Sequence, residues 1–104
     1  MKIEVLYVPG CPNHQPAVEA VTSVLAAESV RTEVCDVPVR SEGEAQAFRF
    51  PGSPTIRVNG NDVEPEPRAT FGLACRLYEN GKGVPSEGAI RRAVVAARQK
   101  ERNH

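Results

Sequence analysis

Cys11 lies in the segment Gly10-Cys11-Pro12-Asn13-His14, which follows an apolar run and precedes a stretch with the periodicity of a helix. A cysteine at the N-terminus of a helix lies beside unpaired backbone N–H groups and the positive end of the helix dipole, which stabilise a thiolate. The thiolate is both a nucleophile and a ligand for soft metal ions. Many redox proteins carry a second cysteine three residues later, in a C-x-x-C motif, but His14 holds that position here. The segment therefore predicts a reactive thiol without a second thiol in its own motif.

His14 and Cys35 are two further residues with possible chemistry. His14 lies about one helical turn after Cys11. As an imidazolium it would stabilise a thiolate, and as a neutral base it would accept the thiol proton or bind a metal ion. The alternative is an exposed polar residue in the first turn. Cys35 lies in a predicted strand, and because free cysteine is among the most buried residue types, we expect it to pack in the interior.

The composition limits the classes of partner. The chain has 104 residues, enough for one domain with one hydrophobic core, and its 13 basic residues balance 13 acidic ones. This balance gives no field that attracts nucleic acid or an anionic membrane, and tryptophan is absent. The N-terminal residues fit neither a signal peptide nor a membrane span, and three cysteines do not form a closed disulfide framework. We therefore expect a soluble cytoplasmic domain over residues 1–104 that binds neither nucleic acid nor membrane.

Apolar spacing and turn signals predict seven elements in the order β–α–β–α–β–β–α. The predicted strands cover residues 3–8, 30–37, 55–58 and 61–64, and the predicted helices cover residues 13–28, a short stretch from Ser41 to Phe48, and a stretch that begins after Ser86. Asn59-Gly60 is typical of a type I′ turn and links the last two strands as a hairpin. The segment 65–85 is rich in proline and glycine, and its middle part fits both a helix and a strand.

This order resembles the thioredoxin-fold superfamily, with Cys11 at the end of the first strand and Ser53-Pro54-Thr55 before the third. The chain is also similar to small bacterial thioredoxin-like proteins that share P-G-C-P-N, G-S-P-T-I-R-V and G-L-x-C-R-x-Y segments, some of which carry an alkylmercury-lyase label. The resemblance implies an α/β fold with a central mixed sheet flanked by helices. It also implies a cis peptide bond before Pro54, with Pro54 against the reactive sulfur and the Ser53 backbone free to pair with an extended substrate. A proline that merely ends the preceding loop is the alternative.

The implied topology also places Cys75. The first and third strands are antiparallel neighbours in that fold, so Cys11 and Pro54 meet at one edge, and the hairpin returns the chain to this edge before the inserted loop 65–85. Long loops at a reactive edge are often functional. We therefore expect Cys75 to be the partner or resolving thiol of Cys11, which requires the two Cα atoms to lie within about 7 Å. A small packing residue is the alternative. Arg76 would stabilise a thiolate or hold an anionic substrate.

Three functions are compatible with these residues. The first is a thiol–disulfide oxidoreductase with Cys11 as nucleophile and Cys75 or glutathione as resolving thiol, acting on a protein or a small-molecule disulfide. Pro54, Ser53 and Thr55 would then line the substrate site, and no cofactor would be needed. The second is a thiolate site for zinc, Cu(I) or mercury, formed by Cys11, Cys75 and His14 without an evident fourth ligand. The third is a non-catalytic binding module, so the sequence leaves open whether the protein is an enzyme.

Overall fold

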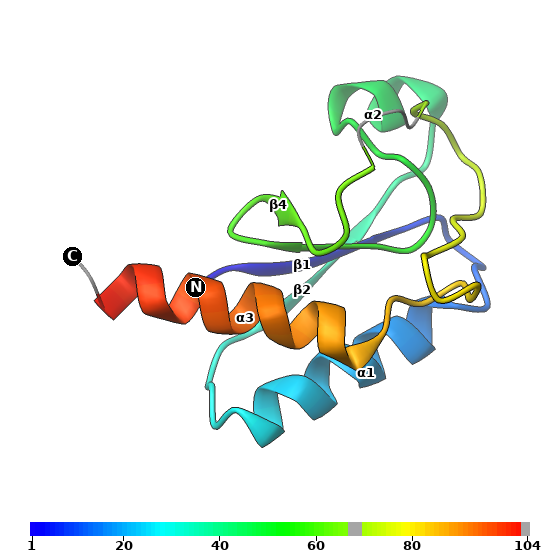
Figure 1. Cartoon of the computed structure of the whole chain (residues 1–104). Coiled ribbons are helices and arrows are strands. Elements are labelled where there is room, and N and C mark those ends of the chain that lie inside the picture. Colours follow the sequence, from blue (N-terminus) through cyan, green and yellow to red (C-terminus); the bar gives the residue numbers. More distant parts are fainter. Residues whose placement is uncertain (67–69, 103–104) are drawn as a thin grey trace.

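The computed structural model describes residues 1–66 and 70–102, so part of the predicted insertion 65–85 and the last two residues lie outside the described residues. Seven elements follow one another in the order β–α–β–α–β–β–α (Figure 1). They are β1 (Ile3–Tyr7), α1 (His14–Ala27), β2 (Val34–Pro38), α2 (Glu42–Ala47), β3 (Thr55–Val58), β4 (Asn61–Asp62) and α3 (Glu87–Arg102).

The four strands form one mixed sheet in the order β2-β1-β3-β4. β1 pairs with β2 in parallel and with β3 antiparallel, and β3 pairs antiparallel with β4. Figure 1 shows α1 and α3 side by side on one face of the sheet and α2 on the other. The prediction of an α/β domain with a central mixed sheet flanked by helices is therefore confirmed. No helix in the described part of the chain is long and apolar enough to cross a membrane.

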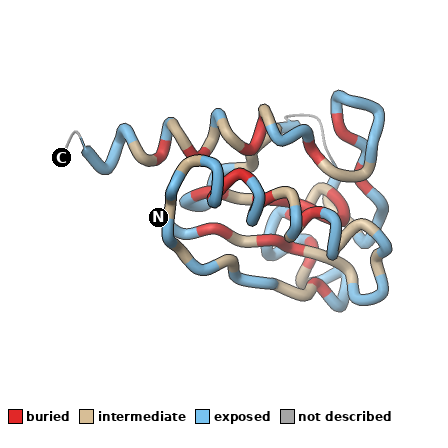
Figure 2. Tube along the Cα trace, turned by 90° about the horizontal axis from the view of Figure 1, so that it is seen from below, coloured by how far each residue is buried: buried red, intermediate tan, exposed pale blue. Residues whose placement is uncertain are grey.

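Alternation along β1 divides the core between the two faces of the sheet. Ile3 and Val5 are fully buried and belong to the larger cluster, under α1 and α3. Leu6 belongs to the second cluster, in which Phe50 packs beside α2. Buried positions also recur along the two long helices, with exposed positions between them (Figure 2). Two faces covered by helices explain why a strand of mostly apolar residues fits the centre of this sheet.

The second strand begins later than predicted, at Val34 instead of residue 30, because α1 ends in a specific cap. Ser29 has a left-handed φ of 53°, its N–H donates to the carbonyl of Ala26, and the N–H of Val30 donates to the carbonyl of Leu25. These two bonds are those of a Schellman motif, which satisfies the last carbonyls of a helix. Val30 therefore belongs to the helix cap and packs against the core there.

Two local predictions about the chain around β3 are confirmed. Asn59 and Gly60 both have positive φ, 52° and 82°, as a type I′ hairpin turn requires. The Ser53–Pro54 peptide bond is cis. Because Leu6 lies opposite Thr55 in the antiparallel pair, the end of β1 meets the start of β3. The loop that follows β1 and the loop that precedes β3 therefore lie at the same edge of the sheet.

Candidate functional site

A pocket of about 240 Å³ lies at this edge and contains two of the three cysteines. It is lined by residues 8–12, by Ser53 and by residues 73–75, so both Cys11 and Cys75 contribute to its wall. The segment after β4 that carries Cys75, residues 72–78, is drawn in yellow in Figure 1 and returns to the loop that follows β1. In the part of the chain that the structure describes, none of the residues that line this pocket is charged. The structure thus brings together the two thiols that the sequence predicts as partners, and neither is in a disulfide.

A tight turn places Cys11 between β1 and α1. The N–H of Cys11 donates to the carbonyl of Val8 at 3.0 Å, with Pro9 and Gly10 at the two central positions. Gly10 has a φ of 88°, and Pro followed by a glycine of positive φ is typical of a type II turn. The carbonyl of Cys11 then accepts the N–H of His14, the first residue of α1, at 3.2 Å. Cys11 therefore lies at the entry to the helix, as the sequence predicts, and is partly exposed.

The backbone and the side chain of Ser53 are both hydrogen-bonded within the protein. Its N–H donates to the carbonyl of Ala74 at 2.8 Å, and its carbonyl accepts the N–H of Arg76 at 3.0 Å. Ser53 and Cys75 thereby form an isolated parallel bridge. The Ser53 hydroxyl accepts the N–H of Val8 at 3.0 Å. The expectation of a free Ser53 backbone is therefore wrong, because the segment after β4 occupies both hydrogen-bonding positions.

Pro54 and Thr55 are buried, and neither lines the cysteine pocket. The Thr55 hydroxyl donates to the carbonyl of Gly52 at 2.7 Å. The Tyr78 hydroxyl donates to the carbonyl of Pro54 at 2.6 Å. Of the three residues Ser53-Pro54-Thr55, only Ser53 lines the pocket, so Pro54 and Thr55, contrary to expectation, do not line it.

Arg76 points away from the pocket into a buried polar cluster. One guanidinium nitrogen donates to the carboxylate of Asp62 at 2.6 Å and to the hydroxyl of Thr55 at 3.3 Å. The other donates to the carbonyl of Glu64, and the guanidinium carbon lies 4.4 Å above the centre of the Tyr78 ring. Its charge is thus paired within the domain. These contacts fix the segment that carries Cys75, which is a positioning role that sequence reasoning missed.

Burial raises the pKa of Tyr78 well above its usual value near 10, and the charges of Asp62 and Glu64 add to this shift while Arg76 opposes it. The unfolded tyrosine ionises near pH 10 while the folded one stays protonated. The stability linked to the protonated phenol is therefore complete below about pH 10 and falls by about 1.4 kcal/mol per pH unit above it. We expect unfolding by urea at increasing pH to show this extra loss in the wild type and not in Tyr78→Phe. Equal pH slopes for the two proteins would contradict the assignment.

His14 contacts the sheet. Its Nε2 lies 2.8 Å from the carboxylate of Asp36 in β2, and its ring stacks on Tyr7 of β1 with 3.6 Å between the ring centres. These contacts attach the start of α1 to two strands. Cys35 is exposed on β2, an edge strand of the sheet, so the prediction that it packs in the interior is wrong. Within residues 1–66 and 70–102, no three metal-ligating side chains are grouped closely enough to hold an ion.

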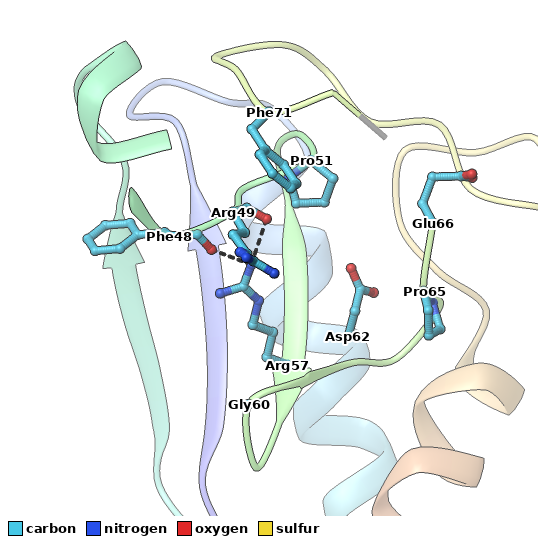
Figure 3. Close-up of a pocket in the computed structure, with 9 residues that line it drawn as sticks. All are labelled: Phe48, Arg49, Pro51, Arg57, Gly60, Asp62, Pro65, Glu66 and Phe71. Atoms are coloured by element: carbon cyan, nitrogen blue, oxygen red, sulfur yellow. Dashed lines mark hydrogen bonds between the residues drawn. The ribbon is translucent and has the colours of Figure 1, made fainter. Parts of the chain in front are cut away.

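A second, larger pocket of about 460 Å³ lies beside β3 and β4 (Figure 3). Arg57 points across it and donates to the carbonyls of Phe48 and Arg49 at 2.7 and 3.0 Å. Asp62 also lines this pocket, but its carboxylate is paired with Arg76. Among the described residues that line this pocket there is no cysteine or histidine, so it offers neither a thiol nor an imidazole. The smaller pocket with two thiols is therefore the better candidate for chemistry.

Comparisons of the chain with family models, with curated proteins and with solved structures found no match.

Proposed function

We propose that the chain is a thioredoxin-like thiol–disulfide exchange protein in which Cys11 is the nucleophile and Cys75 is the resolving thiol. The observation that carries this proposal is that both cysteines line one uncharged pocket although they are far apart in the sequence. The order of the elements, the mixed sheet and the position of Cys11 between β1 and α1 support the thioredoxin-like assignment.

The two thiols supply the nucleophile and the resolving group that exchange requires. The Cys11 thiolate attacks one sulfur of a substrate disulfide, forms a mixed disulfide and expels the other sulfur as a thiolate. The Cys75 thiolate then attacks the sulfur of Cys11, expels the second substrate thiolate and leaves a Cys11–Cys75 disulfide. Two electrons pass from the protein to the substrate. A dithiol or two equivalents of a thiol return the protein to its reduced form.

The assignment of Cys11 as the first nucleophile follows from its place in the chain. The Pro9-Gly10 turn presents Cys11 directly before α1, where the positive end of the helix dipole favours a negative charge. Cys75 lies in an extended segment without a helix terminus and is more exposed. The hydrogen bonds of its two chain neighbours to Ser53 keep Cys75 in the wall of the pocket that Cys11 also lines. Cys11 thus lies where a thiolate is favoured, as an attacking thiol requires, and Cys75 lies where it can reach the mixed disulfide, as a resolving thiol requires.

Oxidation of the reduced protein provides the test. We expect a mild oxidant to produce an intramolecular disulfide that joins Cys11 and Cys75, identified by mass spectrometry of a non-reduced digest. Cys35→Ser is the matched control and should form the same bond, because Cys35 lies outside the pocket. Intermolecular dimers only, or a bond to Cys35, would contradict the proposal.

Two thiols in one uncharged pocket also favour a second candidate, a site for a soft ion such as Cu(I) or Hg(II). The side chain of His14 contacts Asp36 and Tyr7, so this candidate rests on the two thiols. Thiol titration with and without zinc, Cu(I) or Hg(II) separates the two functions. Protection of Cys11 and Cys75 together by one equivalent of ion, with no exchange activity, would favour the metal site. If neither an ion nor a disulfide reacts with Cys11, a non-catalytic binding module remains.

A further inference from the structure

We infer that the cysteine pocket takes small, uncharged disulfides and excludes extended polypeptides. This inference rests on the proposed exchange reaction at Cys11 and adds the class of substrate. Three features support it. The backbone of Ser53 is hydrogen-bonded to the segment after β4, this segment is attached to the domain at several points, and the pocket is small and uncharged.

An extended peptide binds beside a strand or loop when backbone N–H and C=O groups there are free to pair. Ser53 is the residue of the β3 loop that lines the pocket, and its two backbone groups are bonded to Ala74 and Arg76. The bonds measure 2.8 and 3.0 Å, and Ser53 is 2% exposed. The chain's own segment therefore lies where a peptide would have to pair with Ser53.

The segment that covers Ser53 is attached at several points. A further backbone bond joins the N–H of Gly72 to the carbonyl of Phe50 at 3.1 Å. Gly52 has a φ of 145°, and a Cβ atom there would lie 3.0 Å from the Cβ of Arg76. The segment thus packs directly on the backbone that precedes β3. With the guanidinium of Arg76 bound to Asp62, an incoming peptide would have to break an ion pair as well as backbone bonds.

The pocket itself suits a small neutral molecule. Its volume of about 240 Å³ is below the range of about 300–1,000 Å³ that is usual for drug-sized ligands. Among the described residues, none that lines its wall is charged, and the guanidinium of Arg76 is already paired with Asp62. A carboxylate brought into this pocket would lose water without gaining a cation, and the partial positive charge at the start of α1 is smaller than the full charge of a paired cation. We therefore expect discrimination against charged disulfides as well as against peptides.

The reaction is the exchange already described, with a dialkyl disulfide as the oxidant. One molecule of R–S–S–R takes two electrons from Cys11 and Cys75, two R–S⁻ groups leave and take up protons, and the protein keeps one disulfide. A small thiol at high concentration would drive the reverse reaction and regenerate the two protein thiols.

The test compares three disulfides on the reduced full-length Cys35→Ser protein. The probes are hydroxyethyl disulfide, its dicarboxylate counterpart dithiodiglycolate, and an extended peptide whose central cysteine carries a mercaptoethanol disulfide. The rate at which the free Cys11 thiol is lost, whether to the mixed disulfide or to the Cys11–Cys75 disulfide, is measured by mass spectrometry. Each rate is divided by that of free cysteine with the same probe. We expect the neutral small disulfide to exceed each of the other two by about tenfold or more in this ratio.

The outcomes separate the substrate class from the proposed function. A peptide that reacts at Cys11 with the same ratio as hydroxyethyl disulfide would overturn the inference and leave the exchange function intact. An equal ratio for dithiodiglycolate would overturn the exclusion of charge. If none of the three probes reacts at Cys11, the proposed function itself fails.

Weaker attachment of the segment that carries Cys75 should make the pocket more accessible to peptides. In Arg76→Ala the attachment to Asp62 is lost, so the ratio for the peptide should rise severalfold relative to that for hydroxyethyl disulfide. Asp62→Asn removes the same ion pair more mildly and serves where Arg76→Ala does not fold. Arg92→Ala, an exposed arginine on α3, is the control and should keep the wild-type selectivity. A folded Asp62→Asn protein with increased tryptic cleavage after Arg76 but unchanged selectivity would show that the segment does not exclude peptides.

Discussion

Replacement of Arg76 by alanine should lower the free energy of unfolding by about 3 kcal/mol. The side chain of Arg76 is 6% exposed and that of its partner Asp62 is 17% exposed, so the variant would leave a largely buried carboxylate without its cation. Removal of one partner from a buried pair costs about 3–5 kcal/mol, and the residual exposure of Asp62 favours the lower end. Urea unfolding monitored by circular dichroism would measure the loss, which is large beside a typical total of about 5–15 kcal/mol.

Two further variants give this prediction its controls. Arg76→Lys keeps the charge but cannot bond to Asp62, Thr55 and Glu64 at once, so we expect an intermediate loss. Arg92→Ala removes an exposed arginine and should change the stability by no more than about 0.5 kcal/mol. A loss below about 1 kcal/mol in Arg76→Ala would mean that the buried cluster does not hold the segment in place.

Arg76 points into the buried cluster and not toward the pocket, which differs from the prediction made from the sequence. In an extended chain, neighbouring side chains point to opposite sides. Arg76 and Tyr78 are buried, whereas Cys75 and Leu77 are exposed, so the segment alternates as a strand does. In the sequence, the apolar residues of this segment fit a helix as well as a strand. A helix would not separate Arg76 from Cys75, so the sequence predicts both residues at the reactive edge. Its partner Asp62 lies in a different element and gives no local signal.

Local signals, by contrast, predicted the elements well. Ser41 accepts the N–H of Glu44 at 3.1 Å, as its capping-box pattern predicts, and Asn59-Gly60 forms the expected turn. These features depend on residues that are close in the sequence. His14 illustrates the limit, because its contact with Asp36 arises only when β2 pairs beside β1. The sequence alone offered Cys11 as the neighbour of His14, since no other candidate lay within one turn.

The pocket that Cys11 and Cys75 share lies between these two cases. Their shared pocket follows from the antiparallel pair of β1 and β3 together with the return of the chain after β4, and both were predicted from strand order. The bridge between Ser53 and Cys75 was not predictable, because it depends on backbone groups that every residue carries. The residues that could carry chemistry could thus be predicted from the sequence. The segment that hydrogen-bonds to the backbone of Ser53 could be identified only from the structure.

The two cysteines of the pocket should respond differently to substitution. Cys11→Ser should lower the rate of reaction with hydroxyethyl disulfide by about 1,000-fold or more, because a serine hydroxyl does not ionise near neutral pH and cannot attack sulfur as a thiolate does. Cys75→Ser should keep the first step and stop at the second, so the mixed disulfide at Cys11 accumulates. Mass spectrometry of the quenched reaction distinguishes the two species.

Cys35→Ser is again the matched control, because this exposed cysteine lies outside the pocket, and it should react as the wild type does. The reverse pattern, in which Cys75→Ser abolishes the first step and Cys11→Ser accumulates a mixed disulfide, would exchange the roles of the two thiols. It would also mean that exposure of the thiol outweighs its place before α1, since Cys75 is the more exposed of the two. Trapping at Cys11 in Cys75→Ser therefore tests whether the start of the helix selects the nucleophile.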